Sequence, residues 1–231
     1  MAGHAGILVI APHPDDIEFG AAGAIARLIQ EGRQAVYALC TSGDKGTSDR
    51  SNTPEQLAVI REHEQQSAAR VIGVREVVFL RYPDQGLEDS PAFRKDIVRL
   101  IRRFRPETVM TCDPYHRYVY HRDHRIAGQA VLDAVFPFAR DYHAYPDLIQ
   151  EGLEPHKVKE LLFWGSESVN YRCDITDTFM LKLEALRCHE SQVKEFGIPD
   201  LDAWLRSRCS DMAAGEPFEL AEAFHRTLLP P

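Results

Sequence analysis

The segment ILVIAPHPDDIEFG, residues 7–20, passes from an apolar run directly into a group of proline, histidine and aspartate residues. The β-branched run within Gly6–Pro12 predicts a buried strand. Behind it, apolar residues of Asp16–Gln30 recur at helical spacing, and Gly32 follows as a C-cap. We therefore expect a strand, a polar turn and a helix in direct succession.

Similar units follow along the chain. Further strands are expected over Ala35–Thr41, Glu76–Leu80, Thr108–Cys112 and Glu160–Gly165. Helices are expected from the cap Thr53 to about Val71 with Gly73 ending it, and over Phe93–Phe104 and His124–Phe136. Near-continuous apolar strands alternating with helices predict an α/β fold whose mostly parallel sheet carries helices on both faces. We expect Asp177–Pro231 to form helices packed on this domain, and Pro137–His156 to form an irregular loop near the site.

The composition is typical of a globular protein. The chain has 231 residues, 44% hydrophobic and 27% charged, which fits one large domain or two small ones and argues against disorder. The net charge of −8 argues against nucleic acid as a partner, because phosphate contacts need clustered Lys and Arg. One basic cluster, Arg94–Arg105, alternates with apolar residues at helical spacing, so we interpret it as a solvated helix face.

The chain is expected to have no membrane partner and to be cytoplasmic. No apolar run approaches the roughly 20 residues that span a bilayer. The first residues, MAGHAGILVIAPHPDD, lack the basic region of a secretion signal. The cysteines are odd in number and form no CxxC pair, which favours reduced thiols: Cys40, Cys112, Cys173, Cys188 and Cys209.

Two groups of histidine and aspartate follow predicted strands. The first is HPDD, residues 13–16, and the second is HRDH, residues 121–124, which comes after DPYH, residues 113–116. Each lies between a predicted strand and a predicted helix. Because ligands of such sheets bind beyond the carboxyl ends of the strands, we expect the two groups to meet at one edge.

The residue types indicate a metal centre. His13, Asp16 and His124 provide two imidazoles and one carboxylate, and three protein ligands with a vacant position are typical of catalytic zinc. Ferrous iron or another divalent metal suits the same ligands. Asp15, beside Asp16, can face the water of the cation, and Asp123 can orient an imidazole by accepting its N–H.

Other interpretations remain open for each group taken alone. Asp15 and Asp16 can simply stand at a helix N-terminus, and His121 and His124 can be surface residues. A phosphoesterase is the rival enzyme, although it usually needs two metals and more carboxylates. A non-catalytic Rossmann-like binding module is the rival of another class, although no GxGxxG follows the first strand. Two further histidines, His116 and His189, are weak candidates for the site.

Taken together, these stretches resemble the PIG-L or LmbE-like family of zinc-dependent N-acetylglucosaminyl deacetylases. The resemblance rests on HPDD and HRDH together with three other stretches and covers nearly the whole chain in order. These other stretches are REHEQQSAARVIGV at 61–74, LRYPDQG at 80–86 and DITDTFMLKLEALRCHESQ at 174–192.

The resemblance implies a Rossmann-like single domain over residues 1–231 that removes acetyl groups from N-acetylated amino sugars with a metal-activated water. The family's metal ligands correspond to His13, Asp16 and His124. Its catalytic residues correspond to Asp15 as general base, His121 as the group that stabilises the oxyanion or protonates the amine, and Asp123 as the partner that orients His121. Substrate contacts correspond to Arg61 and Asp84.

The chain departs from the family pattern in two places. Arg122 stands where the second motif often has proline, and a tyrosine that assists some relatives has no unambiguous match, because Tyr118 and Tyr120 straddle its position. Relatives commonly form homo-oligomers, so a homo-oligomer is a further expectation.

Overall fold

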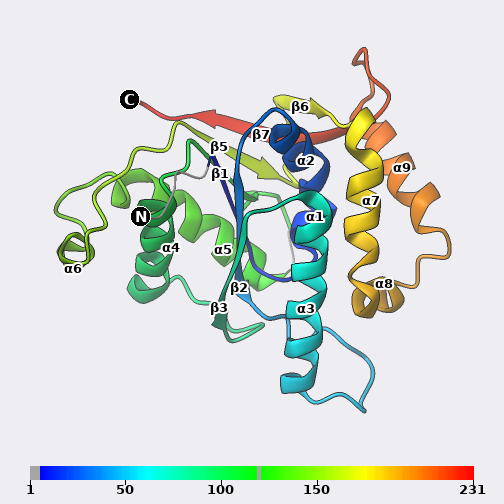
Figure 1. Cartoon of the computed structure of the whole chain (residues 1–231), viewed down its shortest axis with the longest axis horizontal. Helices are drawn as coiled ribbons and strands as arrows, with labels where there is room; N and C mark the ends of the chain where they lie inside the picture. The colour runs from blue at the N-terminus through cyan, green and yellow to red at the C-terminus, as the bar shows by residue number, and fades with distance from the viewer. Residues whose placement is uncertain (1–5, 119–120) are drawn as a thin grey trace.

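Seven strands form one sheet in the order β3-β2-β1-β4-β5-β7-β6 (Figure 1). The computed structural model describes residues 6–118 and 121–231. β1 to β5 are parallel, whereas β7 runs antiparallel to both β5 and β6. The strands are β1 Ile7–Ala11, β2 Ala35–Thr41, β3 Glu76–Tyr82, β4 Thr108–Cys112, β5 Glu160–Trp164, β6 Tyr171–Asp174 and β7 Ala221–Leu228. The mostly parallel sheet predicted from the sequence is confirmed.

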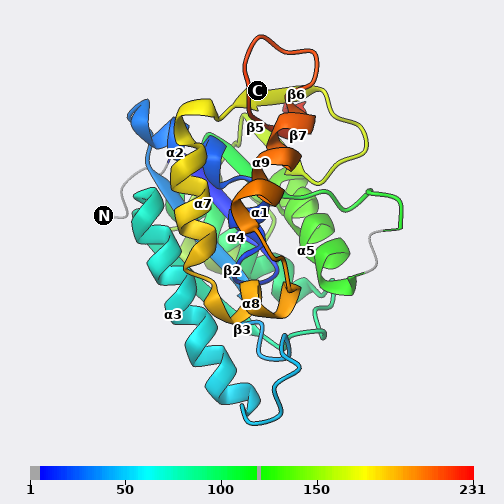
Figure 2. The same ribbon diagram turned by 90° about the vertical axis from the view of Figure 1, so that its right-hand side faces the viewer.

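Helices cover both faces of this sheet, as predicted. Figures 1 and 2 show α1, α2, α3 and α7 on one face and α4 and α5 on the other. The α-helices are α1 Asp16–Gly20, α2 Ala22–Gln30, α3 Pro54–Ile72, α4 Pro91–Phe104, α5 Arg122–Asp133, α6 Pro146–Gln150, α7 Phe179–Arg187, α8 Glu190–Phe196 and α9 Leu201–Met212. A π-helical turn, Ala134–Phe138, and a 3₁₀ turn, Thr176–Thr178, complete the single α/β domain.

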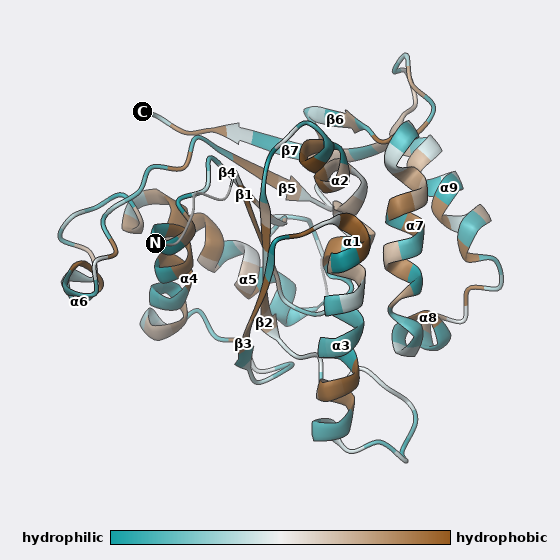
Figure 3. Cartoon of the chain, in the orientation of Figure 1, coloured by the Kyte–Doolittle hydropathy of each residue, from teal (hydrophilic) through white to brown (hydrophobic). Residues whose placement is uncertain are grey.

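The centre of the sheet lies inside the core. Every residue of β1, β2 and β4 is buried, because helices cover both of their faces. The hydropathy colouring accordingly shows central strands in brown between helices with teal outer surfaces (Figure 3). This burial explains why these strands appear in the sequence as continuous apolar runs rather than alternating ones.

The strand order places two loops side by side. From β1 the chain continues outward through β2 and β3, and then returns to β4, which pairs with β1 on its other side. The carboxyl ends of β1 and β4 are therefore neighbours at the position where the strand order reverses, which is the usual ligand-binding edge of such sheets. The loops after these two strands carry the HPDD and HRDH groups.

The caps of α3 follow the sequence signals. The Thr53 side chain accepts the N–H of Gln56, and the Gln56 side chain accepts the N–H of Thr53, which forms a capping box with Pro54 at the first helical position. Gly73 ends the helix with φ of 87°, a conformation that glycine adopts without strain. α4 begins two residues earlier than predicted, because Ser90 caps it through the N–H of Phe93.

The helix predicted over Asp16–Gln30 is two helices. The break falls at Ala21, where φ is −150°. Lys182 of α7 donates to the carbonyls of Glu18 and Phe19 at the end of α1, at 2.7 and 2.9 Å. The buried Lys182 side chain thus compensates for helical hydrogen bonds that the break interrupts. The spacing of apolar residues continues across the break, so the sequence did not indicate it.

A carboxylate from β7 completes the break. Glu222 accepts the N–H groups of Gly23 and Ala24 at the start of α2, at 3.1 and 2.7 Å, and pairs with Lys182 Nζ at 2.6 Å. A negative group at a helix N-terminus and a positive one at a C-terminus both match the helix dipole.

The predicted helical tail, Asp177–Pro231, is wrong at its end, because Ala221–Leu228 is a strand inside the sheet. Because the charged Glu222 faces inward, the sequence of that strand lacks the regular alternation of apolar and polar residues that indicates a strand.

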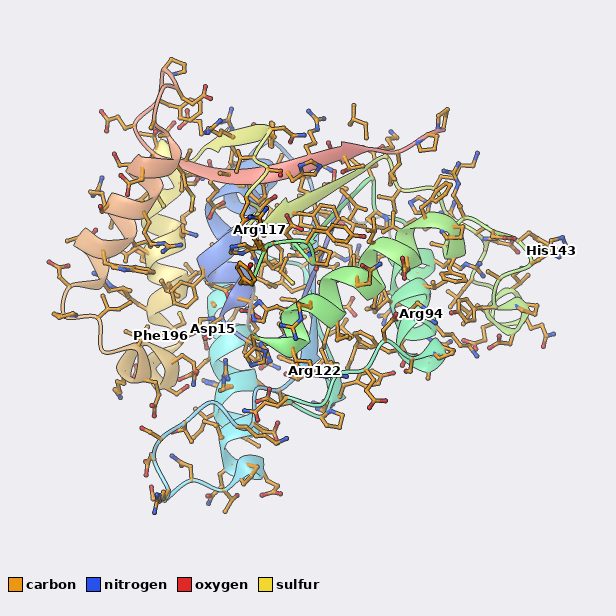
Figure 4. All side chains as sticks on the ribbon, turned by 180° about the vertical axis from the view of Figure 1, so that it is seen from behind. Asp15, Arg94, Arg117, Arg122, His143 and Phe196 are labelled. Atoms are coloured by element: carbon orange, nitrogen blue, oxygen red, sulfur yellow. The ribbon has the colours of Figure 1, made fainter. Side chains whose placement is uncertain are left out.

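The segment Pro137–His156 does not lie near the predicted site. It contains α6 and packs beside α4, and Figure 4 shows His143 at the opposite end of the molecule from Asp15. Arg102 of α4, 2% exposed, donates to the backbone carbonyls of residues 138, 139, 141 and 144. Arg102 is thus an exception to the solvated face predicted for Arg94–Arg105.

Among the residues that the structure describes, no helix has the length and apolar character that crossing a bilayer requires. The five cysteines are free thiols, and all except the half-buried Cys188 are buried.

We predict that Glu222→Ala strongly destabilises the protein. The change leaves the Lys182 ammonium buried without its counter-charge and removes the acceptor at the start of α2, which together cost about 3–5 kcal/mol. Equilibrium unfolding in urea would measure this free energy. Glu31→Ala is the control, because it breaks the exposed pair between Arg27 and Glu31 and should cost less than about 1 kcal/mol. Equal losses in both variants would contradict the role given to Glu222.

Candidate active site

The HPDD and HRDH groups meet at the carboxyl ends of β1 and β4. His13 Nε2 lies 3.2 Å from Asp123 Oδ2, although the two residues are 110 positions apart in the chain. The His13 ring lies 4.6 Å from that of His121 and 5.3 Å from that of His124, measured between centroids. The convergence expected from the sequence is therefore present.

Asp16 lies between two imidazoles. Its Oδ2 is 3.2 Å from His13 Nδ1, and its Oδ1 is 3.2 Å from His124 Nε2. Each of these N···O distances is close to the about 3.4 Å that separates two ligand atoms bound at about 2.1 Å to a tetrahedral ion. Burial by itself would raise the pKa of Asp16, but His124 and His13 outweigh burial and hold that pKa below its usual range.

Two carboxylates fix the other nitrogen of His13. Its Nε2 lies 3.1 Å from Asp84 Oδ1 and 3.2 Å from Asp123 Oδ2, so these carboxylates hold the proton of Nε2. Nδ1, which faces Asp16, is the nitrogen that can bind a cation in place of its own proton. Burial lowers the pKa of His13, but its hydrogen bonds to carboxylates outweigh burial and hold that pKa well above 6.5. Asp123 itself accepts the N–H groups of Gln85 and Leu87, at 2.7 and 3.2 Å.

This arrangement changes the pairing expected for Asp123. The carboxylate of Asp123 orients His13, whereas His121 Nδ1 accepts the backbone N–H of Asp123 at 3.3 Å. His121 is the N-cap of α5, and its neutral ring therefore carries its proton on Nε2. Burial lowers the pKa of His121, and repulsion from His13 and His124 lowers it further, which favours this neutral donor form.

Asp15 occupies a strained turn between β1 and α1. Its φ is 93°, which is unusual for a residue other than glycine, and its side chain is 8% exposed. Burial raises the pKa of Asp15 to about 7, the nearby guanidinium of Arg61 opposes that rise, and the Asp16 carboxylate adds to it. A buried carboxyl that titrates near neutrality suits a group that exchanges protons with a substrate.

Two sets of ligand atoms among the described residues could hold an ion. His13, His121 and His124 bring one nitrogen each within 4.8 Å of one another. His13, Asp84 and Asp123 form a second such set, but it uses the same Nε2 whose proton satisfies both carboxylates. The first set contains two of the three predicted ligands, His13 and His124; Asp16 is in neither set, but one of its oxygens lies 3.2 Å from a nitrogen of each. We therefore consider His13, Asp16 and His124 the better candidate for a metal centre.

A cavity of about 500 Å³ opens over this cluster. Besides seven of the eight residues predicted for the site, it is lined by Gly46, Gln85, His116, Tyr118, Gln192 and Phe196. Phe196 projects from the end of α8 on the same side of the molecule as Asp15 (Figure 4). Sequence reasoning missed the α8 residues, because only tertiary packing brings α8 to the carboxyl edge of the sheet.

The predicted substrate residues Arg61 and Asp84 both line the cavity but are 4% and 3% exposed. Arg61 bonds the Gly43 and Pro14 carbonyls, and Asp84 accepts the N–H of Lys45. Their contact with substrate stays a prediction. Of the two candidate tyrosines, Tyr118 lies at the rim with 87% exposure, and Tyr120 lies outside the described residues.

These features define an α/β protein with a possible His/Asp metal site at the switch point of its sheet. A family model described as PIG-L, GlcNAc-PI de-N-acetylase, matches residues 8–135. The chain belongs to this family, which confirms the resemblance seen in its sequence.

Named relatives agree with this membership. The chain is 38% identical over 189 residues to a diacetylchitobiose deacetylase of Thermococcus kodakarensis, covering 82% of this chain and 70% of the relative. It is 29% identical to a probable N-acetyl-alpha-D-glucosaminyl L-malate deacetylase 2 of Bacillus cereus, covering 81% and 84% of the two chains. The solved N,N'-diacetylchitobiose deacetylase of Pyrococcus horikoshii superposes with a TM-score of 0.89 at 31% identity, over 98% of this chain and 84% of that one.

We predict that Asp123→Asn weakens metal binding about 10–100-fold, because the carboxylate that fixes the tautomer of His13 is lost. Titration of the metal-free protein with Zn²⁺ would measure the affinity. Asp113→Asn is a suitable control, since the Asp113 side chain accepts only the nearby N–H of Tyr115 among the hydrogen bonds described. An unchanged affinity in Asp123→Asn would contradict the orienting role.

Proposed function

We propose that the protein is a metal-dependent N-deacetylase that hydrolyses the acetamido group of an N-acetylglucosamine-type sugar, releasing acetate and the free amine. The observation that carries this proposal is the position of Asp16 at 3.2 Å from both His13 and His124, beside the buried Asp15. His121 faces the same cavity with its N–H available. The names of the relatives support the amino-sugar substrate.

The proposed metal ligands are His13, Asp16 and His124, with Zn²⁺ as the ion and Fe²⁺ or another divalent ion as alternatives. Nitrogen and carboxylate ligands suit both ions, and three protein ligands keep a position open for chemistry. When bound there, the ion supplies a Lewis acid for the amide carbonyl and lowers the pKa of water.

Asp15 and His121 have separate roles in the proposed reaction. Asp15 accepts the proton of the attacking water, and it lines the cavity as a buried side chain paired with Arg61. His121 Nε2–H donates to the oxyanion that develops on the acetyl carbonyl, a contribution of about 3–4 kcal/mol for one donor. Asp15, which holds a proton after the attack, returns it to the leaving amine.

Small amino-sugar conjugates fit the cavity. Its volume of about 500 Å³ lies within the roughly 300–1,000 Å³ typical of small-molecule sites. Its wall combines carboxylates, the Gln192 amide and the Phe196 ring, which suit hydroxyl groups and the apolar face of a sugar. We retain the proposals of a cytoplasmic location and a homo-oligomer from the sequence and the family.

A two-metal phosphoesterase is the rival activity that a structural feature favours. The second ligand set, His13, Asp84 and Asp123, lies beside the first and could accept another ion. Such a pair of ions would have to share His13, whose Nε2 already serves two carboxylates. One metal per chain, measured by elemental analysis, would argue against this alternative.

We predict that the zinc-loaded protein releases acetate from a panel of N-acetylated amino sugars and that a chelator abolishes this release. The panel would contain N-acetylglucosamine, diacetylchitobiose and N-acetylglucosaminyl malate, with acetate measured by a coupled assay. Phosphate esters are the comparison substrates, and faster hydrolysis of these would favour the rival activity. Absence of any hydrolysis by the metal-loaded protein would favour a binding module and sink the proposal.

Matched variants would separate ligands from catalytic residues in the same assay. His124→Ala should lose both metal and activity, because it removes one of the three proposed metal ligands. His121→Ala should keep the metal but lose about 10²–10³-fold in kcat, because it removes the oxyanion donor. Loss of the metal from His121→Ala would contradict the proposed division of roles.

We predict that Asp15→Asn keeps its metal and lowers kcat by about 10²–10⁴-fold, because the amide cannot accept the proton of water. Steady-state kinetics and metal analysis of the same preparation would measure both quantities. Asp44→Asn, at a half-buried position of a neighbouring loop, is a control of the same chemical change. A kcat near that of the native protein would reject Asp15 as the base.

A further inference from the structure

We infer that a buried hydrogen-bond chain formed by Gln65, Glu18 and His189 is a positioning device for Asp15. The inference rests on the proposed role of Asp15 as general base. None of the three side chains lines the cavity, and each is fully buried behind the turn that carries Asp15. They come from α3, α1 and the junction between α7 and α8.

The backbone of Asp15 needs such support. A residue other than glycine at φ of 93° carries about 1–3 kcal/mol of strain, which persists only where surrounding contacts enforce it. Asp15 stands at the N-cap position of α1, but its side chain makes no capping hydrogen bond there. The conformation is therefore held from outside the turn.

Two residues of α3 hold the peptide group that joins Pro14 to Asp15. Arg61 Nη2 donates to the Pro14 carbonyl at 2.5 Å, and Gln65 Oε1 accepts the Asp15 N–H at 3.1 Å. Arg61 and Gln65 are four positions apart, so they project from the same face of the helix. Both polar ends of one peptide group are thus bound, which fixes the orientation of its plane.

Glu18 determines which way the Gln65 amide points. Gln65 Nε2 donates to Glu18 Oε1 at 3.0 Å, so the NH₂ of the amide faces Glu18 and its oxygen faces Asp15. Without this partner the amide could turn and present its NH₂ to the Asp15 N–H, where two donors would repel. The direction of the amide, and with it the hold on Asp15, therefore depends on Glu18.

His189 fixes the remaining oxygen of Glu18. Its Nε2 lies 3.1 Å from Glu18 Oε2, while its Nδ1 has no hydrogen-bond partner among the described residues. Buried charged and polar groups of this kind are costly, and apolar replacements of similar volume are often neutral or stabilising. A network that is expensive for stability and ends on the proposed base is better explained by catalysis than by folding.

The test begins with native protein that hydrolyses one sugar of the panel. If the native protein hydrolyses none of them, the proposed function is overturned, and the inference about Asp15, which rests on that function, falls with it. The variants below test the inference separately, once native activity has been measured. Gln65→Met removes both hydrogen bonds at similar volume. We expect kcat to fall about 10–100-fold, since a displacement of about 1 Å can cost 10²-fold, with KM and metal content close to native. His189→Phe, which releases Glu18 only, should lower kcat in the same direction by a smaller factor.

Two comparisons make the result specific. Glu18→Gln keeps an oxygen for the Gln65 amide and can bond the other tautomer of His189, so it should retain most of the kcat that Gln65→Met loses. Arg102→Lys changes a buried side chain whose described hydrogen bonds all go to backbone carbonyls far from the site, so it should lower the urea midpoint without changing kcat.

Three results would overturn the inference. The first is a kcat within about twofold of native in both Gln65→Met and His189→Phe, whatever their stability. The second is loss of metal from Gln65→Met, which would place the effect on the ligands rather than on Asp15. The third is an equal loss of kcat in Glu18→Gln and Gln65→Met.

Discussion

The pairing of β1 with β4 is the constraint on which the candidate site depends. The chain leaves β1 for two strands on one side and returns on the other, so residues about one hundred positions apart emerge at one edge. His13 then lies against the Asp123 carboxylate and beside the His124 ring. No local sequence preference could produce this contact, because it follows from the order of strands in the sheet.

The second requirement is that short polar segments keep their shape at that edge. α1 has only five residues and could not persist alone, since isolated helices of that length are unstable in water. Lys182 of α7 binds a carbonyl at the end of α1, and Glu222 of β7 binds an N–H at the start of α2, which follows directly. Polar side chains of α3 hold the turn before α1. The C-terminal third of the chain therefore supports the segment that carries Asp15 and Asp16, in addition to lining the cavity through α8.

Much of this arrangement could be predicted because its signals are local. The apolar runs at residues 7–11, 35–41 and 108–112 are buried strands as expected, and the proline and glycine signals at α3 mark its ends correctly. β7 could not be predicted in this way, since the inward Glu222 interrupts its alternation and is satisfied only by Lys182 from α7. The break at Ala21 could not be predicted either, because the helical spacing of apolar residues continues across both helices.

The sequence by itself determined the residue types available for chemistry, their place after buried strands, and the family to which they belong. Those properties depend on residue identity and short-range pattern, which do not require knowledge of the folded chain. Only the tertiary structure decided that Asp123 orients His13 rather than His121, that α8 rather than residues 137–156 walls the cavity, and that Gln65 faces the Asp15 backbone. Each of these is a contact between side chains distant in the sequence, and its geometry is set by how the helices pack on the sheet.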